Sequence, residues 1–295
     1  MSLLTNSAAM TALQTLASTN KSLEATQNRI STGLRINEAS DNAAYWSIAT
    51  SMKSDNKANS AVQDSLGLGA GKVDTAYSAI NKIKDEVDKL KTKLVSAQGA
   101  SAEDQLKIKD EITSITKNIT SFAKNAQYAG TNLLVSDGTA AADLKVVASY
   151  NRTGTSVTVD TINVEAAKIQ LLDGAGTGGI VGTLNTAMAA FAPAAGTPES
   201  DADIKTALDA VETALAGLTT GAATLGAAKS QIDSQKSFLS SLSDSIDKGV
   251  GQLVDADMNK ESARLSALQV QQQLGVQALS IANSSNQQIL SLFRG

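Results

Sequence analysis

Hydrophobic side chains recur every seven residues along much of the chain, and this spacing predicts long helices that pack along one seam. The repeat is strict from Leu66 to Leu94 and runs again, without a gap, from Ile204 to Leu253. The second run predicts one helix of roughly 75 Å, from Asp203 to about Gln252, at about 1.5 Å per residue. A shorter run from Ile108 to Ala129 follows a Gly/Ser turn at 98–102 and predicts an antiparallel partner for the first helix.

The N-terminal segment has its own apolar seam, which contains two polar residues. Polar residues in such a seam either fix the register or are simply tolerated, and we favour tolerance. Gly33 interrupts the periodicity, and residues 37–42 have turn and capping chemistry, so the helix is expected to end between about residues 33 and 43. The seam consists of Ala9, Leu13, Leu16, Asn20, Leu23, Gln27, Ile30 and Leu34.

The two ends of the chain are free of charged side chains. The first ionisable side chain is Lys21, and no charge lies between Arg264 and Arg294. About 20 apolar residues span a bilayer, but this second stretch is rich in Gln and Asn, which are costly to bury in hydrocarbon without partners. We therefore expect no membrane span. Two uncharged, helix-forming ends instead predict surfaces that bind a protein partner.

Residues 135–200 lack the heptad repeat. Two β-prone segments, 144–149 and 156–164, flank a turn at 151–155 and predict a hairpin. A short helix is expected from Ile180 to Phe191. The glycine-rich run at 174–179 (GAGTGG) is not followed by Gly-Lys-Ser/Thr, so a loop explains it better than a phosphate site.

Composition excludes most catalytic chemistry. The chain has no Cys and no His, which removes disulfides, thiol nucleophiles, imidazole bases and almost every transition-metal site. Carboxylate pairs such as Asp201/Asp203 and Asp255/Asp257 are better explained as helix-start and linker residues. We therefore expect no catalytic residue, no cofactor and no metal site.

Charge and targeting features narrow the partners further. The net charge is −4 and the 25 basic residues form no strong run, which argues against nucleic acid. The N-terminus lacks the basic region, apolar core and cleavage site of a secretory signal. The sequence pattern leaves two alternatives, a cytoplasmic protein or export by a route that reads an uncleaved N-terminus.

Together these segments predict a mainly α protein, a long antiparallel helical bundle or coiled coil whose N- and C-terminal helices pair. A small variable insert with α and β structure interrupts it. The expected domains are a terminal coiled coil made of 1–42 and 256–295, a helical bundle made of 43–135 and 201–255, and a surface-exposed insert with a β-hairpin at 136–200.

Three segments carry a specific resemblance. Ile30–Asn37 (ISTGLRIN), followed by Glu38–Ala44 (EASDNAA), closely resembles the N-terminal signature of bacterial flagellins. Asn286–Arg294 (NQQILSLFR) resembles the C-terminal ending of that family, and Ala126–Leu134 (AQYAGTNLL) is similar to the segment that closes the second helix of its helical domain. The three occur in the family's order and, with the heptads, cover nearly everything outside 136–200.

The resemblance implies a structural subunit that self-assembles into the bacterial flagellar filament, an extracellular polymer used for swimming. In the family, the paired terminal helices line the inner tube of a hollow filament, the bundle forms the outer tube and the insert faces solvent. Subunits are exported unfolded by the flagellar type III apparatus. The implied partners are further copies of the chain, other flagellins, the flagellar cap, hook-junction proteins and an export chaperone. The expected filament-core residues are Leu13, Leu16, Leu23, Ile30, Leu34, Leu268, Leu274, Ile281, Ile289 and Leu292.

Host immune receptors sense two segments of flagellins, and this sequence departs from the usual pattern in both. Lys91-Thr92-Lys93 stands where many flagellins carry Arg–hydrophobic–Arg ahead of a glutamine, here Gln98. In the second segment, Glu38 and Tyr45-Trp46 are atypical of the family at large but similar to several alphaproteobacterial flagellins. The receptor-like positions are Leu90, Lys91, Lys93 and Gln98 in the first segment, and Ser31, Gly33, Arg35 and Asp41 in the second.

Two other classes of protein are weaker interpretations. Some flagellins carry a metallopeptidase in the insert, but that enzyme needs His-Glu-x-x-His and this chain has no histidine. A hook–filament junction protein, or another axial protein exported by the type III route, shares the helical ends. The full ISTGLRIN and LSLFR signatures favour a flagellin.

Overall fold

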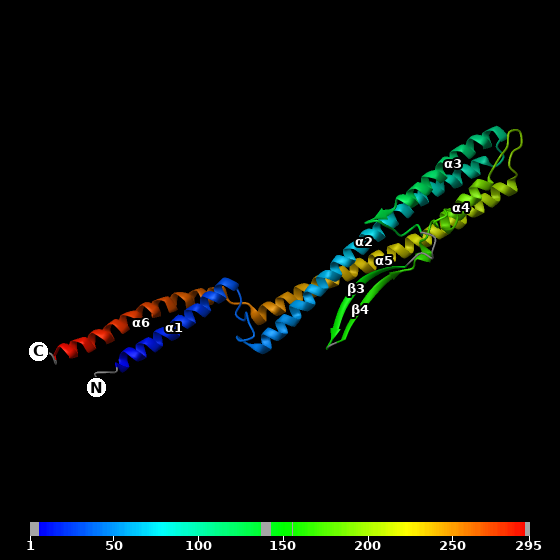
Figure 1. Cartoon of the computed structure of the whole chain (residues 1–295). Helices are drawn as coiled ribbons and strands as arrows, with labels where there is room; N and C mark the ends of the chain where they lie inside the picture. Colours follow the sequence, from blue (N-terminus) through cyan, green and yellow to red (C-terminus); the bar gives the residue numbers. More distant parts are fainter. Residues whose placement is uncertain (1–5, 137–142, 155, 293–295) are drawn as a thin grey trace. The chain divides into compact units, whose positions relative to one another are not determined.

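The computed structural model describes residues 6–136, 143–154 and 156–292. It is mainly helical, as the heptads predict, and divides into two compact units, residues 1–56 with 244–295 and residues 57–243 (Figure 1). Helices α2 and α5 each contribute to both units. The elements are α1 (Ser7–Thr32), α2 (Ala43–Ala97), α3 (Ala102–Asn125), β1 (Gln127–Tyr128), β2 (Thr131–Asn132), β3 (Leu144–Thr153), β4 (Ser156–Val164), the 3-10 helix η1 (Ala166–Lys168), α4 (Gly179–Ala190), α5 (Asp201–Val254) and α6 (Met258–Leu292).

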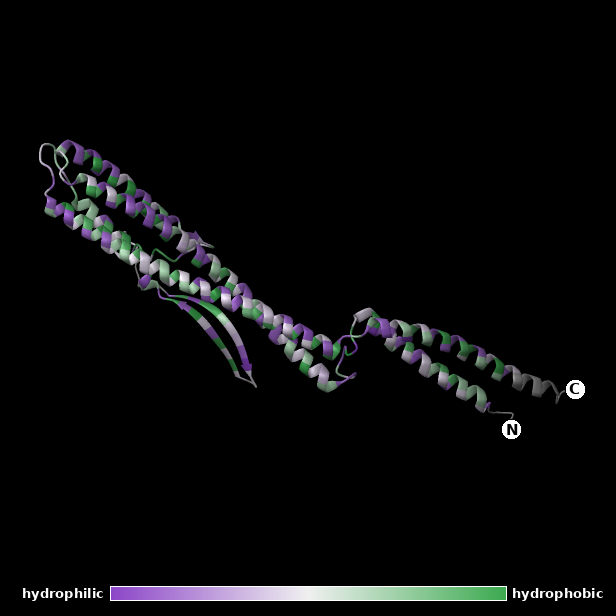
Figure 2. Ribbon diagram, turned by 180° about the vertical axis from the view of Figure 1, so that it is seen from behind, coloured by the Kyte–Doolittle hydropathy of each residue, from purple (hydrophilic) through white to green (hydrophobic). Residues whose placement is uncertain are grey.

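In the unit formed by residues 57–243, the predicted heptad positions are the core. Hydrophobic and hydrophilic residues alternate in bands along α2 and α5 (Figure 2). The heptad residues of both helices are buried. Two ion pairs join the helices, Lys91 with Glu212 and Lys229 with Asp74. From the first pair to the second, the position moves 17 residues back along α2 and 17 residues forward along α5. The helices are therefore antiparallel and in one register. The fully buried heptad residues include Leu66, Val73, Ile80, Val87, Leu94, Val211, Leu218, Leu225 and Ile232.

Helix α3 ends four residues earlier than its periodicity predicts. It stops at Asn125 because the Asn132 side chain donates to the carbonyls of Ala123 at 2.8 Å and Lys124 at 3.1 Å, which satisfies the end of the helix. Between them, Ala129 and Gly130 take positive φ and turn the chain into the two-residue strands β1 and β2. The AQYAGTNLL segment is thus a helix stop followed by a reversal.

The insert contains the expected hairpin; β4 has the predicted bounds, and β3 extends four residues further than predicted. Strands β3 and β4 are antiparallel, with an irregularity between Val147 and Ser149. Ile162 and Val164 at the base of β4 are buried, whereas Val157 and Val159 near the turn are about half exposed. The apolar residues of β4 are therefore buried only at the base of the hairpin.

The insert and strand β1 both approach α2 at glycines, where no side chain of α2 stands in the way. A Cβ on Gly69 would lie 2.6 Å from the Val146 side chain, and one on Gly71 would lie 2.5 Å from Cζ of Tyr128. The glycine-rich loop at 174–179 is filled by its own acid, because Asp173 accepts a hydrogen bond from the Thr177 backbone at 2.8 Å.

In the unit formed by residues 1–56 and 244–295, α1 and α6 lie side by side and antiparallel (Figure 1). Helix α1 ends and α2 begins within the predicted interval, at Thr32 and Ala43. None of the described helices has both the length and the hydropathy needed to cross a membrane.

Candidate assembly site

Small and polar side chains fill the seam between α1 and α6. Ala9, Thr19 and Thr26 are the buried residues of α1. Across the pair, the Gln272 side chain donates to Oδ1 of Asn20 at 2.8 Å, and the Asn6 side chain donates to the Ala282 carbonyl at 3.0 Å. Asn20, although exposed, therefore contacts α6 directly.

Six large apolar side chains of the same two helices point outward. They are between 53% and 68% exposed, and all of them lie in the two stretches of the sequence without charged side chains, residues 1–20 and 265–293. On α1 they border a groove of about 510 Å³ that Ser7, Thr11 and Gln14 also line. This outward set comprises Met10, Leu13, Val270, Leu274, Val276 and Ile281; we call it the outer apolar face.

The expected filament-core residues fall into three groups. Leu16, Leu23, Ile30 and Leu34 are half-buried and Leu268 is buried, so these contribute to the unit itself. Leu13, Leu274 and Ile281 belong to the outer apolar face. The side chains of Ile289 and Leu292 lie outside the described residues. Sequence reasoning missed Thr19 and Thr26, because a buried threonine gives no hydrophobic signal.

An ion pair closes the base of the α1/α6 pair. Nη1 of Arg29 lies 3.4 Å from Oε1 of Glu261, and Glu261 is buried although it is charged. Its other oxygen, Oε2, has no hydrogen-bond partner among the described residues. The buried carboxylate of Glu261 needs the ion pair with Arg29, because removing an unpaired charge from water costs much free energy.

The ISTGLRIN segment connects α1 to α2 and is hydrogen-bonded to the connection between α5 and α6. Gly33 caps α1 with φ of 72°, a left-handed conformation that favours glycine. The Ala256 backbone then donates to the Gly33 carbonyl at 2.9 Å, and the Arg35 backbone donates to the Val254 carbonyl at 2.6 Å. The Arg35 guanidinium donates to the Leu253 carbonyl at 2.8 Å, which caps α5.

The loop before α2 is held by Asp41. Its carboxylate accepts hydrogen bonds from the backbone of Asn37 at 2.9 Å and of Glu38 at 3.3 Å, and these bonds lower the pKa of Asp41 below its ordinary value. Next to it, Oδ1 of Asn42 accepts from the Tyr45 backbone and caps α2. Gly33, Arg35 and Asp41 of the second receptor-like segment therefore all have structural roles, whereas Ser31 is exposed.

The first receptor-like segment is held within the bundle. Leu90 is fully buried, Lys91 pairs with Glu212, and Lys93 lies 2.5 Å from Glu111. The hydrogen bond with Glu212 raises the pKa of Lys91. Gln98 is exposed at the turn after α2.

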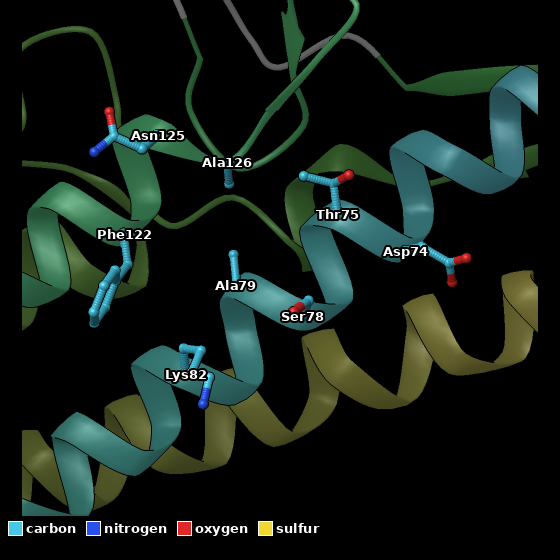
Figure 3. A pocket seen from close by; sticks show the side chains of 8 residues that line it. All are labelled: Asp74, Thr75, Ser78, Ala79, Lys82, Phe122, Asn125 and Ala126. Carbon is cyan, nitrogen blue, oxygen red and sulfur yellow. The ribbon is translucent and has the colours of Figure 1, made fainter.

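A pocket of about 480 Å³ lies between α2 and the end of α3 (Figure 3). Phe122 and Lys82 border one side, while Asp74 points away from both and pairs with Lys229. Its lining therefore brings no acid and base together. Among the described residues, no group of acidic side chains is arranged to hold a metal ion.

An outer apolar face on the uncharged parts of two terminal helices defines a class of protein. The chain is a helical structural subunit built to assemble with copies of itself.

Sequence comparisons identify the family. Residues 3–141 match the bacterial flagellin N-terminal helical region, and residues 208–293 match the bacterial flagellin C-terminal helical region. The chain is 71% identical to a flagellin of Brucella melitensis over all of this chain and 99% of that protein. It is 46% identical to flagellin C of Rhizobium meliloti, over 99% of each. The chain belongs to the bacterial flagellin family, and it is of the alphaproteobacterial type.

One solved structure adds support for the fold alone. A putative flagellar hook-associated protein from Vibrio parahaemolyticus superposes with a TM-score of 0.54 at 14% identity, over 73% of this chain and 100% of that one. The full-length relatives are flagellins, so the junction-protein alternative is not favoured. As a flagellin, the chain is a structural subunit of the extracellular filament that bacteria rotate to swim.

Proposed function

We propose that the subunit polymerises by burying its outer apolar face against other copies of the chain. The observation that carries this proposal is the inverted burial of α1 and α6, whose seam is small and polar while large residues such as Leu274 and Ile281 are exposed. Each fully buried leucine or isoleucine contributes roughly 1.5–3 kcal/mol relative to exposure. Copies that meet through different faces form an open helical polymer when the rotation from one copy to the next does not close into a ring, and we propose that this is the case here.

In this proposal the ten residues expected in the filament core act at two levels. Leu16, Leu23 and Leu268 pack within one subunit and present the outer face, while Leu13 and Leu274 contact the neighbours. The residues 1–42 and 256–295 form the terminal coiled coil, 43–135 and 201–255 form the outer helical bundle, and 136–200 form the solvent-facing insert. The amides of α6 bond laterally between subunits or face a hydrated lumen.

We also propose export of the unfolded chain by the flagellar type III apparatus, with an export chaperone, hook-junction proteins and the cap as transient partners. The family assignment supports this route. The subunit is proposed to be non-enzymatic, which its structural family and its lack of Cys and His support. No cofactor is expected.

Recognition by host receptors is proposed to be weak. Lys91 and Lys93 are tied in ion pairs with Glu212 and Glu111, and Leu90 is inside the bundle. Of the four positions in that segment, Gln98 alone is exposed. A cell-based receptor reporter challenged with purified monomer tests this: a response equal to that of a strongly sensed flagellin would contradict it.

Removal of residues 265–293 tests the assembly proposal. Pelleting and negative-stain microscopy should show long tubes for the full chain and none for the shortened one. Circular dichroism should show that the bundle of residues 57–243 still unfolds cooperatively, because its core does not include the deleted part. Tubes formed by the shortened chain would overturn the proposal.

A further inference from the structure

One side chain of the outer apolar face is chemically reactive. Met10 of α1 is 65% exposed. It lines the groove of about 510 Å³, whose other described lining residues, Ser7, Thr11, Leu13 and Gln14, are all uncharged. The thioether of Met10 is therefore reachable by a small, neutral solute in the free subunit.

The other described methionines have different surroundings. Met188 in α4 is only 5% exposed, and Met52 in α2 is half-buried. Met258, the first residue of α6, is 43% exposed, but it directly follows Asp257 and lies outside the two uncharged stretches. Among the described residues, Met10 is thus the methionine that is more than half exposed and also belongs to the outer apolar face.

We propose that Met10 is an oxidation site, through which hydrogen peroxide prevents a free subunit from joining a filament. A lone pair of the Met10 sulfur attacks one peroxide oxygen, so that an S–O bond forms and the O–O bond breaks. The second oxygen leaves as hydroxide, takes the proton of the new S–OH group and becomes water. The sulfur is oxidised by two electrons to a sulfoxide, and the peroxide is reduced to water. The inference rests on the proposed assembly through the outer apolar face.

The sulfoxide makes one point of an apolar surface polar. Burial of a polar oxygen without a hydrogen-bond donor costs free energy, and the hydroxyl of Thr11 in the same groove already donates to the Ser7 carbonyl at 3.0 Å. In the free subunit the sulfoxide remains in water, so the fold of α1 is kept while its surface no longer suits an apolar neighbour. Methionine sulfoxide reductases reverse the reaction, so the block on assembly is reversible.

Peroxide treatment of the full-length monomer tests the proposal. After the peroxide is removed, peptide mass spectrometry locates the oxidised methionines and pelleting gives the critical concentration for polymerisation. Oxidation of Met10 should raise that concentration roughly tenfold, and a methionine sulfoxide reductase with a thiol reductant should restore it. Polymerisation of Met10-oxidised monomer at the parent's concentration would overturn the proposal. Failure of the untreated chain to polymerise would overturn the assembly proposal instead.

Two variants show which methionine is responsible, each compared with its own untreated sample. Peroxide should leave the critical concentration of Met10→Leu unchanged, whereas Met258→Leu, the matched control, should respond as the parent does. An equal response of Met10→Leu and the parent would place the sensitive group elsewhere and contradict the proposal. The oxidised parent should keep its helicity and thermal midpoint, because Met10 is exposed. A fall of that midpoint in step with the loss of assembly would show damage to the fold and would contradict the proposal as well.

Discussion

The bundle of residues 57–243 and the α1/α6 pair are both built from long antiparallel helices, yet they bury opposite kinds of residue. In the bundle, leucine, isoleucine and valine at the heptad positions are almost fully buried, and charges cover the outside. In the α1/α6 pair, the buried residues of α1 are Ala9, Thr19 and Thr26, while the six large apolar residues of the outer apolar face are more than half exposed and lie in uncharged stretches of the sequence. The first region is complete in one chain, and the second is not.

This difference shows how a heptad-like pattern is to be interpreted. A seam flanked by charges identifies a partner helix within the same subunit, since solvated charges mark the surface. A seam whose flanks are amides and small residues identifies a helix that meets partners on more than one side. The charge distribution, more than the apolar spacing, distinguishes the two cases here.

The sharpest test exchanges the same side chain in both regions. Leu225→Ala, in the bundle core, should lower the free energy of unfolding by about 2–5 kcal/mol. Leu274→Ala, on the outer apolar face, should change it by less than about 0.5 kcal/mol because the side chain is exposed in the monomer. Denaturant unfolding of monomers measures both.

Polymerisation should rank the two variants the other way. Leu274→Ala should raise the critical concentration, whereas the Leu225→Ala monomer that remains folded should assemble at the parent's concentration. A large loss of monomer stability in Leu274→Ala would show that α6 is buried within the subunit after all.

A second test compares close approaches at glycine. Gly71→Ala should destabilise the bundle by about 1–3 kcal/mol, because its Cβ would lie 2.5–2.9 Å from atoms of the Tyr128 ring. Gly275→Ala in α6 meets only Cδ1 of Leu16, at 2.9 Å, the end of a flexible side chain that moves aside. The gain in helix propensity, about 1 kcal/mol, should then leave Gly275→Ala neutral or stabilised.

Gly67→Ala is the matched control for this test. It lies in α2 close to Gly71, and its Cβ would meet nothing within 4 Å. Thermal unfolding should show Gly67→Ala at or above the parent's midpoint and Gly71→Ala below it. Equal midpoints for the two variants would refute the close packing of Tyr128 on α2.

The sequence predicts the bundle better than the terminal pair, for a physical reason. Heptad residues such as Ile80 and Leu218 give a strong periodic signal because their partners are in the same chain. In α1 the apolar pattern includes Leu13, which faces outward, and omits Thr26, which faces inward. A pattern set by several partners at once cannot identify which face the subunit itself buries.

The sequence pattern also does not predict two contacts, the cap of α3 and the ion pair between α1 and α6. The stop of α3 at Asn125 depends on the side chain of Asn132, seven residues away, and on the reversal between them. The buried Arg29–Glu261 pair joins residues from opposite ends of the chain, and no local spacing signals it.

That ion pair provides a third, smaller test. Glu261→Ala should cost about 2 kcal/mol, less than a fully buried pair, because Arg29 keeps about a third of its side-chain exposure and regains water. Hydrogen exchange should accelerate in α1 and in the first turns of α6. The exposed pair of Lys229 with Asp74 in the bundle is the counterpart, and Asp74→Ala should leave exchange there unchanged because exposed pairs contribute little. Equal acceleration of hydrogen exchange in both variants would contradict the expected difference between the two ion pairs.

The smallest expected effect is a loss of stability at low pH. It distinguishes Asp41 from Asp104 by the cause that lowers the pKa of each. Asp41 is held mainly by the backbone of Asn37 and Glu38, and Asp104 first by the Lys107 side chain. A pKa lowered by folding gives stability that is present above the ordinary value of 3.8 and lost as the pH falls through the folded pKa.

Salt should distinguish these two sources. Screening weakens the attraction between the exposed charges of Asp104 and Lys107, but it leaves hydrogen bonds from backbone N–H groups largely intact. An acid titration of monomers, followed by helicity in parent, Asp41→Asn and Asp104→Asn, should therefore show the Asp41 contribution unchanged at high salt and the Asp104 contribution reduced. Loss of both contributions at high salt would contradict this. It would mean that attraction between charges, and not hydrogen bonds from the backbone of Asn37 and Glu38, holds the loop before α2.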